Sequence, residues 1–137
     1  MRYAVLTLAL LVLGACSQQA GDTASADQGK FAGLEPQIVA WRTAIEAESP
    51  VCTAKTDSRG CQGFAVTCKR ERPVTPEEAA HGVSARLVAA MTYSSRAADA
   101  RPGSAVAEFT RTNGAWSRAP AEAVNMATCE AAPHSKT

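Results

Sequence analysis

The sequence lacks the residue patterns that usually mark a catalytic or metal-binding site. It contains only two histidines, His81 and His134, and their spacing does not suggest a metal site. It has no Cys-x-x-Cys pair, no His-Glu-x-x-His, no Gly-x-Ser-x-Gly and no phosphate-binding loop. The adjacent Glu77 and Glu78 would point in different directions on a helix, so they do not form a carboxylate pair. We therefore expect a protein that is not an enzyme, with no catalytic residue, no metal ligand and no cofactor.

An excess of charge of one sign and a long hydrophobic run are also missing. The 14 basic and 13 acidic side chains almost cancel, which gives a formal net charge of +1. Because nucleic acids are bound through an excess of Lys and Arg, we expect no nucleic-acid partner. The main apolar run covers residues 4–13, whereas a membrane-spanning helix needs about 20 apolar residues. At 137 residues the chain forms one domain at most.

The N-terminus has the layout of a signal peptide. Arg2 supplies a positive charge, and residues 4–13 are apolar apart from one threonine. The small residues Gly14-Ala15 follow this run, as they do before a cleavage site. We predict that residues 1–15 are a signal peptide.

The four residues Leu13-Gly14-Ala15-Cys16 resemble the lipobox of bacterial lipoproteins, whose usual form is Leu, a small residue, Gly or Ala, and Cys. In that class the thiol receives diacylglycerol, a peptidase cuts before the cysteine, and the new amino group is usually acylated. The resemblance implies that Cys16 is the lipidation site and holds the protein on a membrane, since two or three acyl chains release slowly. Ser17 follows, where an Asp would resemble an inner-membrane retention signal. The resemblance therefore implies the periplasmic face of the outer membrane.

A flexible tether is expected after the lipidated cysteine, over residues 16–32. This segment contains no aliphatic residue larger than alanine, so it buries too little surface to offset its chain entropy. The folded domain is expected over residues 33–131, and residues 132–137 are expected to form a disordered tail.

An amphipathic helix is predicted over residues 35–48. Its apolar residues recur at spacings of four, three and four, which places them on one face: Leu34, Ile38, Trp41 and Ile45. Trp41 is interpreted as a core residue in preference to a residue that lines a ligand cleft.

Alternating apolar residues predict two strands after a polar loop at residues 51–62. The second strand covers residues 83–93, and between the strands Thr75 and Glu78 have the spacing of a capping box. The charged run at residues 69–72 is interpreted as a solvated strand edge. Three alternating residues share one face of the first strand: Phe64, Val66 and Cys68.

The Asn-Gly pair at residues 113–114 predicts a two-residue hairpin turn. In that register Phe109 and Trp116 lie on one face, together with Arg111 and Arg118. The arginine stems are expected to cover the aromatic rings. The alternative is that this face binds anions or sugars.

The predicted fold class is α+β, with one N-terminal amphipathic helix packed on an antiparallel sheet of three to four strands. Residues 120–130 remain ambiguous between a short helix and an extended strand, because periodicity does not decide at this length.

Four cysteines remain once Cys16 is set aside, and an oxidising compartment favours two disulfides. The candidates are Cys52, Cys61, Cys68 and Cys129. Three pairings are possible, and the sequence alone does not choose among them. The pairing that we favour joins Cys52 to Cys61 across the polar loop, and Cys68 to Cys129 between the first strand and the C-terminus.

Two classes of function fit these expectations. The first is a non-catalytic binding or structural module of the cell envelope, which docks to another envelope protein or to the cell wall. The alternative is an inhibitor or protective lipoprotein that acts on an envelope hydrolase and presents the loop at residues 52–61.

Overall fold

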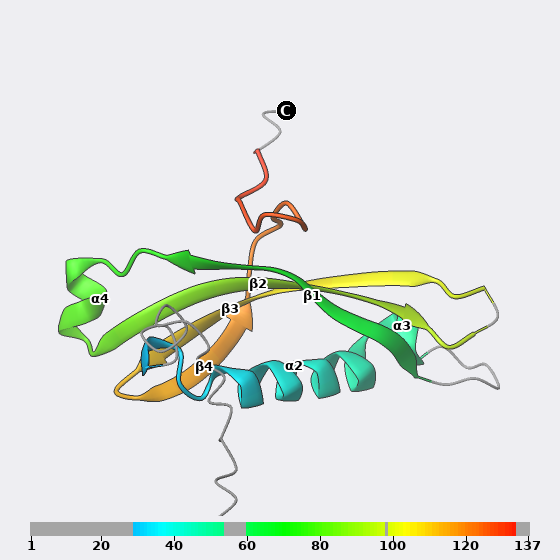
Figure 1. Ribbon diagram of the computed structural model, residues 1–137, viewed down its shortest axis with the longest axis horizontal. Helices are drawn as coiled ribbons and strands as arrows, with labels where there is room; N and C mark the ends of the chain where they lie inside the picture. Colours follow the sequence, from blue (N-terminus) through cyan, green and yellow to red (C-terminus); the bar gives the residue numbers. More distant parts are fainter. Residues whose placement is uncertain (1–28, 54–59, 98, 134–137) are drawn as a thin grey trace, which may run out of the picture.

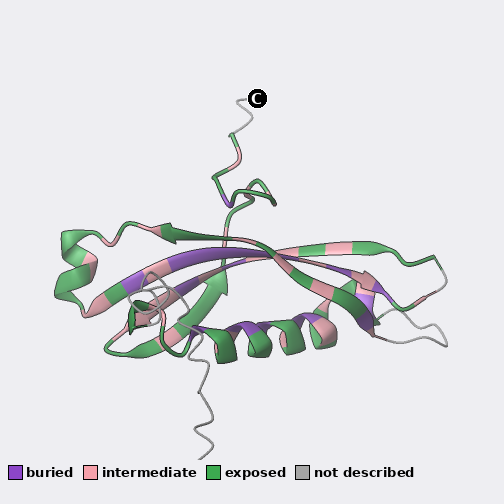
Figure 2. Cartoon of the chain, viewed as in Figure 1, coloured by how far each residue is buried: buried purple, intermediate pink, exposed green. Residues whose placement is uncertain are grey.

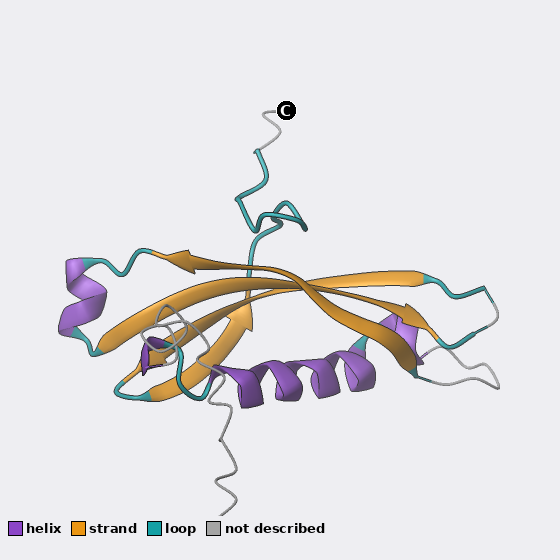
Figure 3. Cartoon of the chain, in the orientation of Figure 1, coloured by secondary structure: helices purple, strands orange, loops and turns teal. Residues whose placement is uncertain are grey.

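The computed structural model describes residues 29–53, 60–97 and 99–133. Four strands form one antiparallel sheet in the order β1-β2-β3-β4, with a long helix on one side (Figures 1 and 3). The elements are α2 (Leu34–Glu48), α3 (Pro50–Thr53), β1 (Cys61–Arg72), α4 (Pro76–Ala80), β2 (Val83–Ser95), β3 (Pro102–Thr112) and β4 (Ala115–Pro120). The four-stranded antiparallel sheet and the two disulfides agree with the α+β prediction. The polar loop is shorter than expected, because residues 50–53 form α3.

The helix α2 packs its apolar face against the sheet, as the spacing of its residues predicts. Leu34, Ile38, Trp41 and Ile45 are all buried. Figure 2 shows that the buried side of α2 is the side that faces the strands. Trp41 meets the ring of Phe109 edge to face, with 5.7 Å between centroids, and Phe109 is completely buried. Trp41 is therefore a core residue.

The other face of the sheet is covered by the C-terminal segment. After β4 the chain crosses the sheet on the side opposite α2 (Figure 1). Cys129 reaches β1, where it forms a disulfide with Cys68, and it packs with Val88 and Ala90 of β2. The ambiguity at residues 120–130 is resolved as turns and irregular chain, with a single bridge between Val124 and Ala131.

A β-bulge in β1 corrects the expectation that Phe64, Val66 and Cys68 share one face. Phe64 and Val66 pack on the core beneath α2, whereas Cys68 belongs to the cluster on the opposite face. The β1–β2 register shifts between Val66 and Cys68. An extra residue at a bulge reverses the alternation of side chains beyond it. As a result Lys69 lies on the α2 side, where it forms an ion pair with Glu35.

The two turn predictions are confirmed by the structure. The side chain of Thr75 accepts a hydrogen bond from the amide of Glu78, whose carboxylate accepts one from the amide of Thr75. The hairpin at residues 113–114 pairs Arg111 with Trp116 and sets the register of β3 and β4. Local side-chain chemistry therefore specifies both connections.

We predict that Gly103→Ala lowers the free energy of unfolding by about 1–3 kcal/mol, because the added methyl overpacks the core. A Cβ at Gly103 would lie 2.3 Å from Cε2 of Tyr93. That ring is held by stacking on Phe64 and by a 3.1 Å hydrogen bond between its hydroxyl and Ser49. The measurement is urea denaturation. Gly29→Ala is the control, since a Cβ there meets nothing within 4 Å; equal effects of the two variants would contradict the prediction.

Candidate functional site

The four candidate disulfide cysteines form two pairs. Cys52 bonds to Cys61 and Cys68 bonds to Cys129, which is the one that we favoured of the three possible pairings. Cys52, Cys61 and Cys129 are buried. The lipidation candidate Cys16 and residues 54–59 of the predicted inhibitory loop lie outside the described residues.

The chain enters the fold through a segment that we call the strap, residues 29–33. Arg111 donates hydrogen bonds of 3.1 Å to the carbonyl oxygens of Gly29 and Lys30. The indole of Trp116 donates to the carbonyl of Ala32 at 2.8 Å and stacks on Phe31, with 6.4 Å between ring centroids. Residues 29–32, which the composition assigned to the tether, therefore pack on the folded domain.

The strap occupies part of the hairpin face for which the sequence left two interpretations. One guanidinium nitrogen of Arg111 and the indole nitrogen of Trp116 donate to strap carbonyls, and Phe31 covers the indole. Arg111 and Trp116 therefore hold residues 29–33 of the chain, a contact that neither sequence interpretation of this face included.

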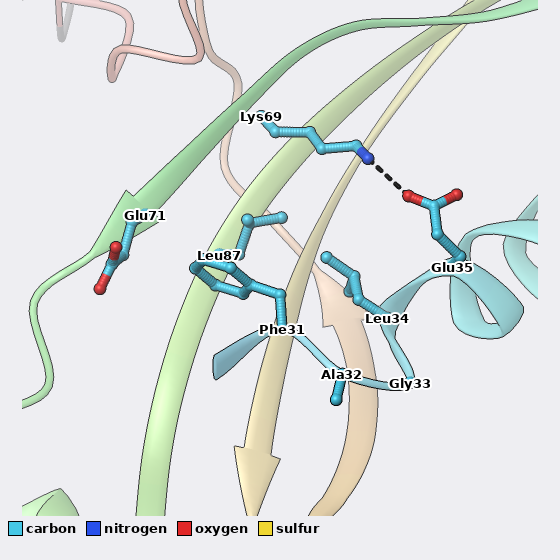
Figure 4. Close-up of a pocket in the computed structure, with 8 residues that line it drawn as sticks. All are labelled: Phe31, Ala32, Gly33, Leu34, Glu35, Lys69, Glu71 and Leu87. Atoms are coloured by element: carbon cyan, nitrogen blue, oxygen red, sulfur yellow. Dashed lines mark hydrogen bonds and ion pairs between the residues drawn. The ribbon is translucent and has the colours of Figure 1, made fainter. Parts of the chain in front are cut away.

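A shallow groove of about 850 Å³ lies between the strap, the start of α2 and β1. Figure 4 shows Phe31, Leu34 and Leu87 on its apolar side, with the Lys69–Glu35 ion pair across one end. A second ion pair joins Lys30 of the strap to Glu71 of β1. These ion pairs are exposed and contribute little to stability. The groove offers an apolar wall and two charged pairs.

A second groove of about 430 Å³ lies between the C-terminal half of α2 and strands β3 and β4. Its apolar lining includes Trp41, Ile45 and Tyr93. Glu48 of α2 and Arg118 of β4 also line it, and neither forms an ion pair with any residue in the described part of the chain. We call this the β3 groove.

Strand β3 borders the β3 groove and is only partly covered by β4. The pairing of the two strands stops where Pro120 meets Ala107. The remaining part of β3, residues 102–106, is paired with β2 on one side only, among the residues that the structure describes. We call this stretch the open edge.

A charge cluster lies at the other end of the sheet, around Arg86. Its guanidinium contacts the carboxylates of Glu78, at 3.0 Å, and Glu108, at 2.5 Å. The hydrogen bond to Glu108 raises the pKa of Arg86 above its usual value. The hydrogen bond from the amide of Thr75 lowers the pKa of Glu78 below 4.5. These groups join α4 to the sheet and hold one another in the charged state.

The described residues contain no group of three or more His, Cys, Asp or Glu side chains placed to hold a metal ion. His81 caps the end of α4, and His134 falls beyond residue 133. Within the same ranges, no helix is long and apolar enough to cross a membrane. No family model, curated protein or solved structure matches the chain.

Proposed function

We propose that the chain is a lipoprotein of the bacterial cell envelope, anchored through Cys16 and acting as a non-catalytic binding or structural module. The proposed location is the periplasmic face of the outer membrane. The observation that carries the proposal is the cysteine arrangement. The two disulfides use Cys52, Cys61, Cys68 and Cys129 among themselves, so Cys16, at the end of the apolar leader, is the one cysteine left for a lipid.

The position of the strap supports an orientation in which the far end of α2 faces away from the membrane. The chain enters the domain beside the β3–β4 hairpin, at the start of α2 (Figure 1). Helix α2 has 15 residues and therefore carries the chain about 22 Å away from that point. The Cys52–Cys61 disulfide and the open edge of β3 lie toward the far end of α2 (Figure 1). Because the strap is the part of the domain nearest to Cys16 in the sequence, the far end of α2 is the end that we expect to meet partners.

Replacing Cys16 with alanine should abolish labelling by radioactive palmitate and membrane sedimentation, because the acyl chains would have no attachment point. Cell fractionation and lipid labelling measure this directly. Ser17→Asp is the matched control: it should keep the label and shift the protein to the inner membrane. Labelling or sedimentation that is unchanged in the alanine variant would overturn the anchor.

Crosslinking in intact cells, followed by pull-down of the full chain, tests the binding role. A reproducible envelope partner is the expected result. Inhibition of an added lysozyme or protease would instead favour the alternative, an inhibitor of an envelope hydrolase. The Cys52–Cys61 disulfide supports that alternative to the extent that it closes the predicted loop.

A further inference from the structure

The direction of the main-chain groups along β3 can be established from contacts at its two ends. The carbonyl of Arg101 accepts a hydrogen bond of 2.8 Å from the amide of Ser95, and the carbonyl of Arg111 accepts one from the hydroxyl of Ser84. The main-chain N–H and C=O groups of the odd-numbered residues of β3 therefore point toward β2. Successive residues of a strand direct their N–H and C=O groups to opposite sides. The even-numbered residues of β3 consequently direct theirs away from β2.

Two of these even-numbered residues, Ser104 and Val106, lie in the open edge. Their main-chain groups face the line along which β4 would continue, but β4 ends at Pro120, opposite Ala107. The chain leaves that line to cross the sheet and bring Cys129 to β1. Neither residue has a main-chain hydrogen bond to the segment after β4. The C-terminal disulfide thus explains why the edge is left open.

The other edge of the sheet carries features that discourage strand addition. Strand β1 has two register shifts along its length, and the charged residues at 69–71 form ion pairs with α2, with Glu130 and with the strap. Bulges and charges are common means of protecting an edge strand. The open edge of β3 carries no bulge and no charge: after Pro102 at its start, residues 103–106 are Gly, Ser, Ala and Val, in regular register with β2.

The β3 groove gives an added strand a place for its side chains. A strand that paired with the open edge would direct alternate side chains toward α2, where Trp41, Ile45 and Tyr93 provide apolar walls. Glu48 and Arg118 line the same groove without an ion pair among the described residues. The complementary segment directs one face toward α2, where apolar residues are joined by a basic residue for Glu48 and an acidic residue for Arg118, and it carries polar residues on the other face.

We infer that the open edge of β3 binds an extended, alternating segment of a partner protein by strand addition. This inference rests on the proposed binding function and names its surface. A second copy of the chain fits less well. Two such edges could overlap only over residues 102–106, since β4 occupies β3 from Ala107 onward in each copy.

The test uses purified full-length protein in detergent and one synthetic probe, an acetylated heptapeptide amide of sequence Lys-Thr-Val-Thr-Val-Thr-Glu, whose Lys, Val and Glu side chains share one face. Two further versions carry N-methyl groups on alternate residues, one set on each edge of the extended peptide. Because only one peptide edge can face β3, we expect one N-methylated version to bind about tenfold more weakly while the other binds as the parent does. NMR should show slower hydrogen exchange at the amides of Ser104 and Val106.

The variant Ser104→Pro removes an amide that faces away from β2, at a position where an edge strand tolerates proline. This variant should abolish peptide binding. Slow hydrogen exchange at the amides of β2 should persist, which would show that the sheet is still folded. The N-methyl comparison on wild-type protein tests the inference even if this variant misfolds. Equal binding of all three peptides would overturn it. Slower amide exchange at the strap, in place of Ser104 and Val106, would also overturn it. Another contradicting result would be a wild-type protein that binds no peptide and sediments as a dimer, while the Ser104→Pro variant sediments as a monomer. None of these results bears on the Cys16 anchor, which lipid labelling tests separately.

Discussion

Replacing Cys68 and Cys129 together with alanine should lower the free energy of unfolding by about 4 kcal/mol, because the disulfide closes a loop of 61 residues. The bond restricts the unfolded chain more strongly as the loop lengthens. Replacing both cysteines leaves neither partner of this disulfide behind as an unpaired thiol that could exchange with the Cys52–Cys61 bond. Urea denaturation followed by circular dichroism gives the change in free energy.

The second disulfide supplies the matched control. Cys52 and Cys61 are nine residues apart, so replacing both with alanine should cost somewhat under about 3 kcal/mol on the same basis. The order of the two losses is the critical result. If the short loop proves to stabilise as much as the long one, loop entropy is not the main contribution of the Cys68–Cys129 bond.

The variant without Cys68 and Cys129 should also show whether losing this disulfide loosens only the C-terminal segment or the whole domain. Cys129 packs with Val88 and Ala90, on the face opposite α2. Hydrogen exchange in the C-terminal segment should therefore accelerate more than exchange in α2. Uniform acceleration over the whole domain would indicate that the two faces of the sheet unfold together.

The sequence predicts best those parts of the fold that depend on neighbouring residues. The apolar face of α2, the capping box at Thr75 and the hairpin turn at residues 113–114 all follow from spacings of four residues or fewer. The favoured disulfide pairing also agrees with the structure, although the spacing left other pairings open.

The remaining features depend on contacts between distant segments and have no local signal. The bulge before Cys68 becomes visible only in the register of β1 against β2. The strap looks like a tether by composition, because its stability comes from Arg111 and Trp116, more than 80 residues away in the chain. Phe31, the one bulky residue there, was the signal that could have indicated packing. The open edge follows from the path of the chain to Cys129, which no spacing encodes.

Phe109→Ala should lower the free energy of unfolding by about 3–5 kcal/mol, because it leaves a cavity in the centre of the core. Phe109 is completely buried, lies between Leu87 of β2 and Arg118 of β4 in the sheet register, and meets Trp41 edge to face. Denaturant unfolding of Phe109→Ala and of the milder Phe109→Leu measures the effect.

Val39→Ala provides the contrast on α2, since Val39 is 62% exposed and its truncation should change stability by less than about 0.5 kcal/mol. The position of Phe109 depends on the hairpin register: a shift by one residue would turn its ring away from α2 and expose it. A loss at Phe109 no greater than that at Val39 would therefore contradict the register of β3 itself. Because the same register directs Ser104 and Val106 toward the open edge, it would also remove the basis for strand addition there.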